Sequence, residues 1–405
     1  MIAFAHTRLS ARFKRDLTLI QGGILRRGLL ASLVMIVFIV IQSGTIFQFV
    51  ETRDGAVVQD FWAFHAAAEG TLKGGAAALY EKEAFQALFA DARGLLWLYP
   101  PTMLVLIAPF GLLSYGAAKT IWLIASVVAM IAAARFLTGK NAFLTVIALL
   151  SPAFFAAMFT GQLSVIFAGL LAAGLFFAKT RPIIAGVCLG LLTVKPQLGL
   201  LVPVFLVLTG SWRAIAWAAL TALALATVSL LAFGAESWAA FFASLTQTHS
   251  DFVQSYGHPG RVTLPDALQI LGWRSAPTAA ITAMAVMICA AMLYFAKRAH
   301  AQWRALAALT MILTVISAPY FWVYDWAFVA FAILLFISGR PSLSVNAQVA
   351  LVAAWFAALS PYLGGGKYAV PLIWAVLAYV GWIIFDCARK QSRPHSQFIE
   401  SKNVV

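Results

Sequence analysis

Long apolar segments follow one another along nearly the whole chain, separated by short polar stretches. Many approach or exceed 18 residues, and a helix needs about 20 residues to cross the hydrocarbon core of a bilayer. Their apolar positions are continuous rather than alternating, which is typical of membrane helices and not of barrel strands. The pattern predicts an all-α polytopic membrane protein. The expected spans lie near residues 29–49, 101–114, 117–137, 143–159, 163–178, 214–233, 279–295, 306–318, 326–337, 349–359 and 370–385.

A further apolar segment, residues 182–210, is interrupted by the triplet Lys-Pro-Gln at 195–197. Proline lacks an N–H donor and breaks a helix, so two structures are possible. The segment forms either one long broken helix or two half-helices that enter and leave on one side. Basic residues at both ends, Arg181 and Arg213, suit the second structure. The total expected is about ten to twelve spans, with twelve favoured, and no repeat marks inverted transporter halves.

Two polar loops interrupt the apolar pattern, at residues 51–98 and 234–277. The first holds half of the 14 Asp and Glu residues of the chain, and this acidic excess suits the outer side of a membrane. Within it, 61–74 and 81–94 have helical periodicity and end on glycine. We therefore expect a long first extracytoplasmic loop that carries short interfacial helices.

Composition and charge strengthen the membrane assignment. Hydrophobic residues make up 62% of the chain and charged residues only 10%, whereas soluble domains carry roughly 25% charged residues. The net charge of +14 comes from short basic clusters between apolar segments, the pattern of cytoplasmic loops rather than of a nucleic-acid-binding face. We expect a cytoplasmic tail at 1–28, a transmembrane domain at 29–386 and a cytoplasmic tail at 387–405.

Ionisable groups near the membrane need a chemical reason, since they are costly there. Asp60 precedes a cluster of aromatic residues just outside the first span, where it could act as a general base or simply cap an interfacial helix. Lys195 lies in the middle of an apolar segment, where it could bind a phosphate as a point charge or extend its side chain to an interface. Gln162 could donate a hydrogen bond to a sugar or to a neighbouring helix.

Aromatic residues surround two further candidates. Tyr99 precedes two prolines where the first polar loop re-enters the membrane, so it could stack on a sugar or only mark the start of a helix. Asp325 follows Tyr324 at the mouth of a later span. It could bind a sugar hydroxyl, pair with Lys195 or Lys367, or stay solvated.

The sequence lacks the motifs that indicate metal binding, nucleotide binding or a serine nucleophile. The six histidines are scattered, without a His, Cys and carboxylate set at metal-ligand spacing. Phosphate-binding loops and serine-nucleophile motifs are absent from the sequence. We expect no cofactor and predict no metal site, and the sequence leaves metal dependence open.

A set of short motifs resembles glycosyltransferase family 87 over roughly residues 30–330. Their order and spacing carry the resemblance: Asp60-Phe61, Leu79-Tyr80, Tyr99-Pro100-Pro101, Pro109, Trp122, Gly161-Gln162, Gly186 and Lys195-Pro196-Gln197. The resemblance implies a GT-C fold and a polyprenyl-phosphate-mannose-dependent mannosyltransferase in the bacterial plasma membrane, with both termini cytoplasmic. Its partners would be membrane lipid, a polyprenyl-phosphate-linked sugar donor and a glycolipid or glycan acceptor, with no nucleic acid.

The resemblance also implies roles for individual residues. Asp60 matches the aspartate that acts as catalytic base in the family, and the reaction would invert the anomeric carbon. A histidine-rich segment found in actinobacterial members is replaced here by Pro319 to Asp325, which leaves the acceptor open. The donor phosphate would be bound by Lys195, Arg261 and Lys367. From the residues themselves, rather than from the resemblance, we expect the sugar or acceptor to be bound by Tyr99, Gln162, Gln197, Tyr320, Tyr324 and Asp325.

A transporter or flippase of a lipid-linked or small polar substrate is the alternative. Such a protein should carry internal repeats and ionisable residues along the middles of several spans. The polar residues here concentrate in one outer loop, which favours an interfacial enzyme.

Overall fold

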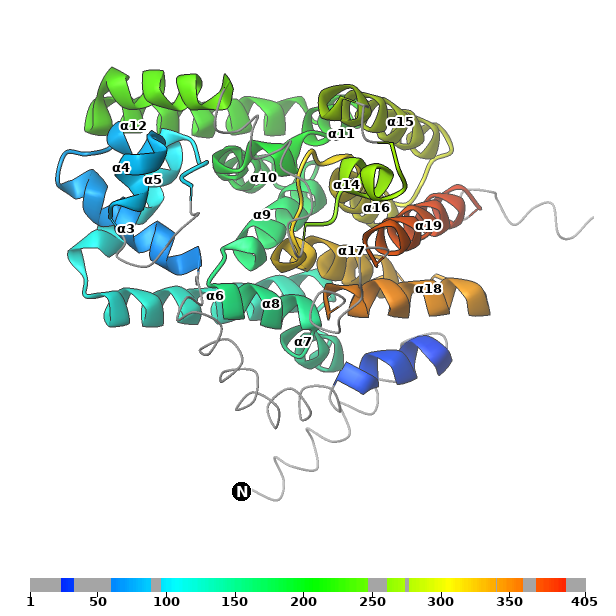
Figure 1. The fold of residues 1–405 in the computed structure, drawn as a ribbon. Coiled ribbons are helices and arrows are strands. Elements are labelled where there is room, and N and C mark those ends of the chain that lie inside the picture. The colour runs from blue at the N-terminus through cyan, green and yellow to red at the C-terminus, as the bar shows by residue number, and fades with distance from the viewer. Residues whose placement is uncertain are drawn as a thin grey trace, which may run out of the picture.

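The computed structural model describes residues 23–32, 60–88, 96–246, 261–273, 277–339, 341–359 and 369–390. These residues form helices without a strand, and one isolated bridge joins Arg261 to Trp322 (Figure 1). Residues 23–32 are helical as well. The remaining elements are α3 (Asp60–Leu72), η1 (Ala78–Tyr80), α4 (Lys82–Gln86), α5 (Pro101–Ile107), η2 (Ala108–Leu112), α6 (Tyr115–Leu137), α7 (Ala142–Leu149), α8 (Pro152–Thr160), α9 (Ser164–Phe177), α10 (Pro182–Leu191), η3 (Leu192–Val194), η4 (Pro196–Gly199), α11 (Val202–Leu208), α12 (Trp212–Thr246), α14 (Leu264–Ile270), α15 (Thr278–Arg298), α16 (Trp303–Ser317), η5 (Val323–Trp326), α17 (Ala327–Ser338), α18 (Val345–Phe356), η6 (Ala357–Leu359) and α19 (Ala369–Lys390).

The chain is an all-helical polytopic membrane protein. Within the described residues, 4 helices are long and apolar enough to cross a bilayer, namely α6, α12, α15 and α19, or 5 if the bent pair α7–α8 counts as one span. The other apolar helices have 10–17 residues, so by length the described residues give fewer spans than the ten to twelve expected. Most of the expected first span, 29–49, lies outside the described residues.

Capping residues explain why the expected span at 143–159 becomes two helices. The Asn141 side chain accepts a hydrogen bond from the Leu144 N–H at 2.8 Å and begins α7. Ten residues after Asn141, the Ser151 hydroxyl caps α8, with Pro152 in its first turn. The two helices meet at 44° because this second cap interrupts the hydrogen-bond ladder.

The first polar loop contains the interfacial helix expected near its start, now seen as α3, whereas α4 is shorter than its predicted segment. The second loop differs from the prediction in extent. Helix α12 continues through residue 234 to Thr246, with non-helical backbone at Gly234 (φ 76°). Glycine adopts this backbone angle without a steric penalty, so the chain bends and then continues as a helix.

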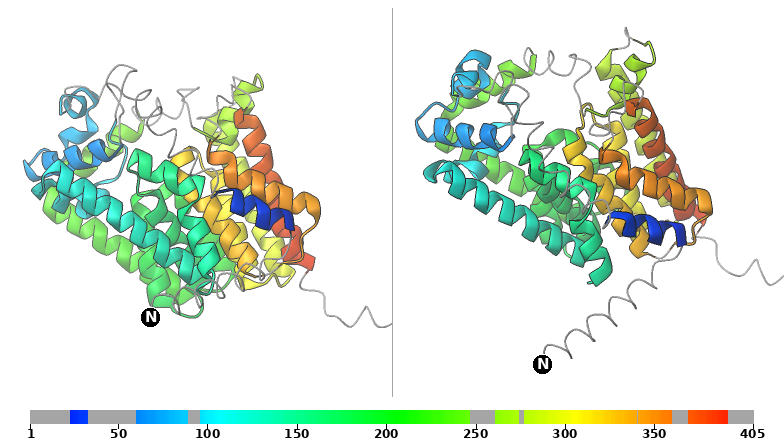
Figure 2. Two further views of the ribbon diagram at one scale, coloured as in Figure 1. Left: turned by 90° about the horizontal axis from the view of Figure 1, so that it is seen from below. Right: turned by 60° about the horizontal axis from the view of Figure 1, so that its bottom comes forward.

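Helices α9 and α10 lie in the middle of the molecule (Figure 1). On one side are α3, α4 and α5, packed against α12, and on the other are α14 to α19 (Figure 2). The apolar side chains of α17 are almost entirely buried. In contrast, only 11% of the most apolar window of α12 is buried, so most of that window lies on the outer surface of the helical bundle.

Basic side chains gather where α6, α9, α16 and α17 meet. Arg304 donates hydrogen bonds to the Leu137 carbonyl at 2.7 Å and to the Ser338 hydroxyl at 2.9 Å. The Trp303 indole N–H donates to the Phe176 carbonyl at 2.8 Å. We call this the basic end of the bundle; it also includes Arg135, Lys179, Arg213, Lys297 and Arg298.

The interrupted segment at 182–210 leaves the basic end and comes back to it. The ammonium of Lys179, just before α10, donates to the carbonyl of Gly210, just after α11, at 3.0 Å. A single helix over this length would separate its ends by about 40 Å. The structure therefore selects the two half-helices that enter and return, and we call residues 182–208 the re-entrant hairpin.

Candidate active site

A cavity of about 380 Å³ lies between α3, the segment before α5, the tip of the re-entrant hairpin and residues 320–324. Charged, amide and aromatic side chains share its wall. The lining residues are Asp60, Ala63, Phe64, Leu96, Trp97, Leu98, Tyr99, Pro100, Gln162, Val194, Lys195, Pro196, Gln197, Phe241, Leu245, Tyr320, Trp322 and Tyr324. Most of the predicted site residues therefore meet in one place, although the chain separates them widely.

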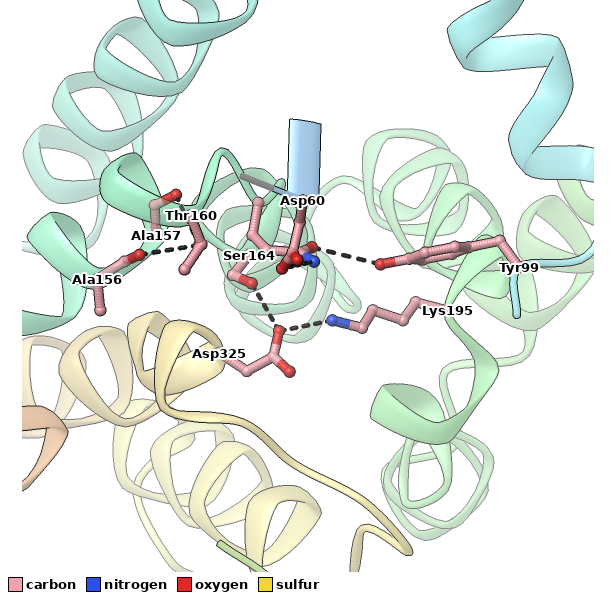
Figure 3. A network of polar contacts seen from close by, with 9 residues as sticks. Asp60, Tyr99, Ala156, Ala157, Thr160, Ser164, Lys195 and Asp325 are labelled. Atoms are coloured by element: carbon pink, nitrogen blue, oxygen red, sulfur yellow. Dashed lines mark hydrogen bonds and ion pairs between the residues drawn. The ribbon is translucent and has the colours of Figure 1, made fainter. Parts of the chain in front are cut away.

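Asp60 is the first residue of α3 and lines this cavity. The Gln162 side-chain N–H₂ donates to Asp60 Oδ2 at 2.7 Å, and the Tyr99 hydroxyl donates to Gln162 Oε1 at 3.3 Å (Figure 3). The tyrosine orients the amide so that its nitrogen faces the carboxylate. One carboxylate oxygen is thus held in place by this network.

A left-handed turn places Gln162 beside Asp60. Helix α8 ends at Gly161 (φ 73°), and the Gln162 N–H donates back to the Ala157 carbonyl at 3.0 Å, as in a Schellman cap. The Trp122 indole N–H donates to the Gly161 carbonyl at 2.8 Å. A Cβ at Gly161 would lie 2.6 Å from Cβ of Phe61, so the close approach of α8 to α3 requires glycine.

Lys195 forms the tip of the re-entrant hairpin, where the backbone leaves the helical conformation (φ −134°). Its ammonium lies 2.6 Å from Asp325 Oδ1, and the two side chains are 4% and 2% exposed. The Ser164 hydroxyl donates to the same carboxylate oxygen at 2.6 Å (Figure 3). Of the structures left open for Asp325, the pair with Lys195 is the one that forms.

The cavity changes the acidity of Asp60, which lies outside the candidate spans. Burial raises its pKa to about 6, against the opposing effects of the Gln162 hydrogen bond and the Lys195 charge, and the Asp325 charge raises it further. A carboxyl with this pKa is mostly ionised at neutral pH and is a stronger base than an ordinary aspartate.

An aromatic wall faces the two charged groups. Tyr320, Trp322 and Tyr324 all line the cavity, and the rings of Trp322 and Tyr324 stack with centroids 5.8 Å apart and planes 9° apart. Aromatic faces of this kind bind the apolar faces of sugars. Trp322 is absent from the predicted site residues, although the spacing of two residues between these three aromatics could have revealed it.

The remaining predicted residues lie in different places. Gln197 lines the cavity. Arg261, a candidate phosphate ligand, is buried outside the lining and forms an ion pair with Asp266 at 2.6 Å. Lys367 lies outside the described residues. Within the described ranges, no group of three or more His, Cys, Asp or Glu side chains could hold a metal ion.

A second cavity of about 370 Å³ adjoins the first and is almost wholly apolar. It lies between the re-entrant hairpin and α12, and Pro196 lines both cavities. Gly186 lets these helices approach closely, since a Cβ there would lie 2.2 Å from Cβ of Trp217. An apolar groove therefore runs from the charged tip of the hairpin along its side.

A model of glycosyltransferase family 87 matches residues 97–319. The chain belongs to glycosyltransferase family 87. The match includes Tyr99, Gln162 and Lys195, whereas Asp60 lies 37 residues before its start and Asp325 lies 6 residues after its end. No curated protein and no solved structure matches the chain.

Family membership confirms the resemblance seen in the sequence motifs. It identifies the chain as a membrane glycosyltransferase and favours an enzyme over the transporter alternative. Its partners are accordingly a glycosyl donor, a glycosyl acceptor and membrane lipid. The cavity is the candidate place for transfer, because it brings a carboxylate with raised basicity, a cation and an aromatic wall together.

Proposed function

We propose that this membrane glycosyltransferase moves mannose from a polyprenyl-phosphate donor to a hydroxyl of a lipid or glycan acceptor, with Asp60 as general base. The observation that carries the proposal is that the Asp60 carboxylate and the Lys195 ammonium line one cavity. Base and leaving group must lie on opposite sides of the reacting carbon in a direct displacement, and these two groups come from different elements of the wall.

In the proposed reaction, the acceptor oxygen attacks the anomeric carbon and its proton passes to Asp60. The bond between that carbon and the phosphate oxygen breaks, and the configuration inverts. Gln162 holds Asp60 Oδ2, which leaves the other carboxylate oxygen for the proton. General base catalysis of this kind contributes about 10²–10⁴-fold to the rate.

Lys195 is the proposed ligand of the leaving phosphate. The ammonium stabilises the negative charge that grows on the phosphate as the bond breaks. Among the three cations predicted for this role, it is the one that lines the cavity; Arg261 is paired elsewhere, and Lys367 lies outside the described residues.

The apolar groove supports a donor with a lipid tail. A polyprenyl phosphate places an anionic headgroup at the end of a long apolar chain. The charged tip at Lys195 and the adjoining groove along α12 have the same arrangement. A lipid tail that enters such a groove from the bilayer exchanges one apolar environment for another, so the groove can hold it without a desolvation cost.

The positions of the basic residues support an orientation in the membrane. The basic end would face the cytoplasm, and the cavity would open on the outer side of the bacterial plasma membrane. Both termini then lie in the cytoplasm. The donor would enter from the bilayer and the acceptor from the outer surface.

The test uses the protein in nanodiscs with radiolabelled polyprenyl-phosphate-mannose and a membrane extract as acceptor. Label should pass to the acceptor, and polyprenyl-phosphate-glucose should be a poorer donor. Lys195→Met should reduce donor binding strongly, while the matched change Lys179→Met at the basic end should leave it unchanged. Transfer from a nucleotide sugar without a lipid-linked donor, or full activity of Lys195→Met, would contradict the proposal.

A further inference from the structure

Asp325 lies behind Lys195, away from the cavity. The residue is 1% exposed and does not line the cavity, whereas Lys195 does. Because a sugar in the cavity meets the lysine side of this pair, Asp325 would act on such a sugar only through Lys195. Its position fits a role that acts through Lys195.

The segment that carries Asp325 is held on several sides. The Phe321 carbonyl accepts a hydrogen bond from the Val262 N–H at 2.7 Å, and the Trp326 indole N–H donates to the Ala354 carbonyl at 2.7 Å. Ser164, at the start of α9, binds Asp325 Oδ1 at 2.6 Å. The Asp325 carboxylate is therefore held in one position, and a flexible side chain that forms an ion pair with it is held there as well.

Lys195 needs such a partner. A lysine ammonium sits on a flexible four-carbon stem, and this one extends from the tip of a hairpin where the helix is broken. Burial of an ammonium without an anionic partner is costly. A fixed carboxylate both compensates the charge and limits the places that the ammonium can occupy.

We propose that Asp325, oriented by Ser164, is a positioning residue that holds the Lys195 ammonium at the cavity wall to bind the donor phosphate. This inference rests on the phosphate role of Lys195 in the proposed function. The pair does not exclude a phosphate, since an ammonium carries three N–H donors and Asp325 Oδ1 takes one.

The chain offers a matched control in the pair Arg261–Asp266. Both pairs have an N–O distance of 2.6 Å, and their side chains are all at most 6% exposed. Neither Arg261 nor Asp266 lines the cavity. Asp266→Asn therefore removes a buried ion pair of the same kind whose side chains do not line the proposed phosphate site, although the backbone of Arg261 is bridged to Trp322.

The experiment measures binding of polyprenyl phosphate and of the uncharged polyprenol to the full chain in nanodiscs. The ratio of the two affinities reports recognition of the phosphate, and a general loss of stability would not change it selectively. Asp325→Asn should lower this ratio about tenfold, as removal of an orienting partner does for metal ligands. Asp266→Asn should leave the ratio unchanged.

Ser164→Ala is a milder second variant for the case that Asp325→Asn does not fold. It keeps the ion pair and removes one hydrogen bond to the carboxylate, so the ratio should fall about threefold to fivefold, equivalent to a net hydrogen bond of ~1 kcal/mol. A ratio unchanged in both variants, or an Asp325→Asn protein that binds polyprenyl phosphate more tightly than wild type, would overturn the inference.

Lys195→Met separates this inference from the proposed function. If wild type and Lys195→Met show the same ratio, the phosphate role of Lys195 fails and the inference fails with it. If Lys195→Met loses the preference for phosphate while Asp325→Asn and Ser164→Ala keep it, only the positioning role of Asp325 is wrong.

Discussion

Two aspartates, Asp60 and Asp325, lie close to the same cavity with different partners. Asp60 lines the cavity and accepts a hydrogen bond from the neutral amide of Gln162. Asp325 is buried, does not line the cavity, and binds the Lys195 ammonium and the Ser164 hydroxyl. Asp60 is half-buried and Asp325 is fully buried, and α9 with its preceding turn helps to hold both carboxylates.

This difference shows that the role of a carboxylate beside the cavity depends on whether its partner is a cation or a neutral amide. A carboxylate bound to a cation is committed to that cation and keeps it in place. A carboxylate bound to a neutral amide, with a pKa raised by burial to about 6, stays available to accept a proton. The same residue type thus serves as base in one position and as support in the other.

The largest effect is expected from Asp60→Asn. It distinguishes the two aspartates, because Asp60 should affect the transfer step and Asp325 the binding of the donor phosphate. Asp60→Asn keeps the shape of the side chain and one acceptor oxygen but removes the base, so transfer should fall by about 10²–10⁴-fold. Binding of polyprenyl phosphate should change little. Measurement of single-turnover transfer beside lipid binding checks both expectations, and a variant with wild-type transfer would remove Asp60 from the reaction.

A change at Gly161 should separate Asp60 from Gln162 without altering either residue. Gly161→Ala adds a Cβ that would lie 2.6 Å from Cβ of Phe61, so α8 must move away from α3. Displacement of a catalytic group by about 1 Å can reduce a rate by up to about 100-fold, and we expect transfer to fall at least about tenfold.

Gly139→Ala is the matched control for that substitution. Gly139 also has a positive φ, 66°, but nothing lies within 4 Å of the added Cβ. Both variants should lose about 1–2 kcal/mol of stability from backbone strain, as thermal unfolding would report. Equal transfer rates in the two variants would mean that the contact between α8 and α3 does not position Asp60.

The pH dependence of transfer reports on the environment of Asp60. Because the base acts when ionised, kcat/KM should rise with pH through an acid limb near pH 6. The groups that face Asp60 are Gln162, Lys195, Asp325, Tyr99 and Tyr324. A limb at the pH of an ordinary aspartate would show that the carboxylate is solvated during the reaction.

Replacement of Gln162 should move that limb. Gln162→Leu removes a hydrogen bond that lowers the pKa of Asp60, so the pKa rises and the acid limb shifts to higher pH. At pH values below the new limb the rate should fall, while at high pH it should approach the wild-type rate. A pH-independent loss would indicate that Gln162 binds substrate rather than the base.

The smallest effect is expected from Tyr99→Phe. The Tyr99 hydroxyl orients the Gln162 amide at 3.3 Å, and loss of one neutral hydrogen bond changes stability by about 1 kcal/mol. The acid limb should shift in the same direction as in Gln162→Leu but less. A larger shift than in Gln162→Leu would mean that Tyr99 acts on Asp60 by another route.

Much of the fold follows from the sequence. Apolar segments of membrane length predict the helices, and the proline beside Lys195 predicts the break in the hairpin. The sequence does not set the direction of the chain after that break, because a break interrupts hydrogen bonds without setting the angle between the helices. The contact between Lys179 and Gly210, which decides the direction, joins residues 31 apart.

The sequence predicts those residues of the candidate site whose charge is unusual in an apolar segment. Lys195 and Asp325 stand out because charge is costly beside apolar residues. Ser164 does not stand out, because a serine at the start of an apolar helix looks like a helix cap. Its binding of Asp325 depends on a partner 161 residues away, and packing alone brings the two together.

The re-entrant hairpin changes how membrane topology should be mapped on this chain. Because residues 182–208 enter and leave at the basic end, the loops before and after them lie on the same side of the membrane. Reporter enzymes fused after Thr180 and after Ser211 should therefore give the same signal. A reporter fused after Pro196 would separate the two arms, and its signal would describe a half-inserted hairpin that the complete protein never contains.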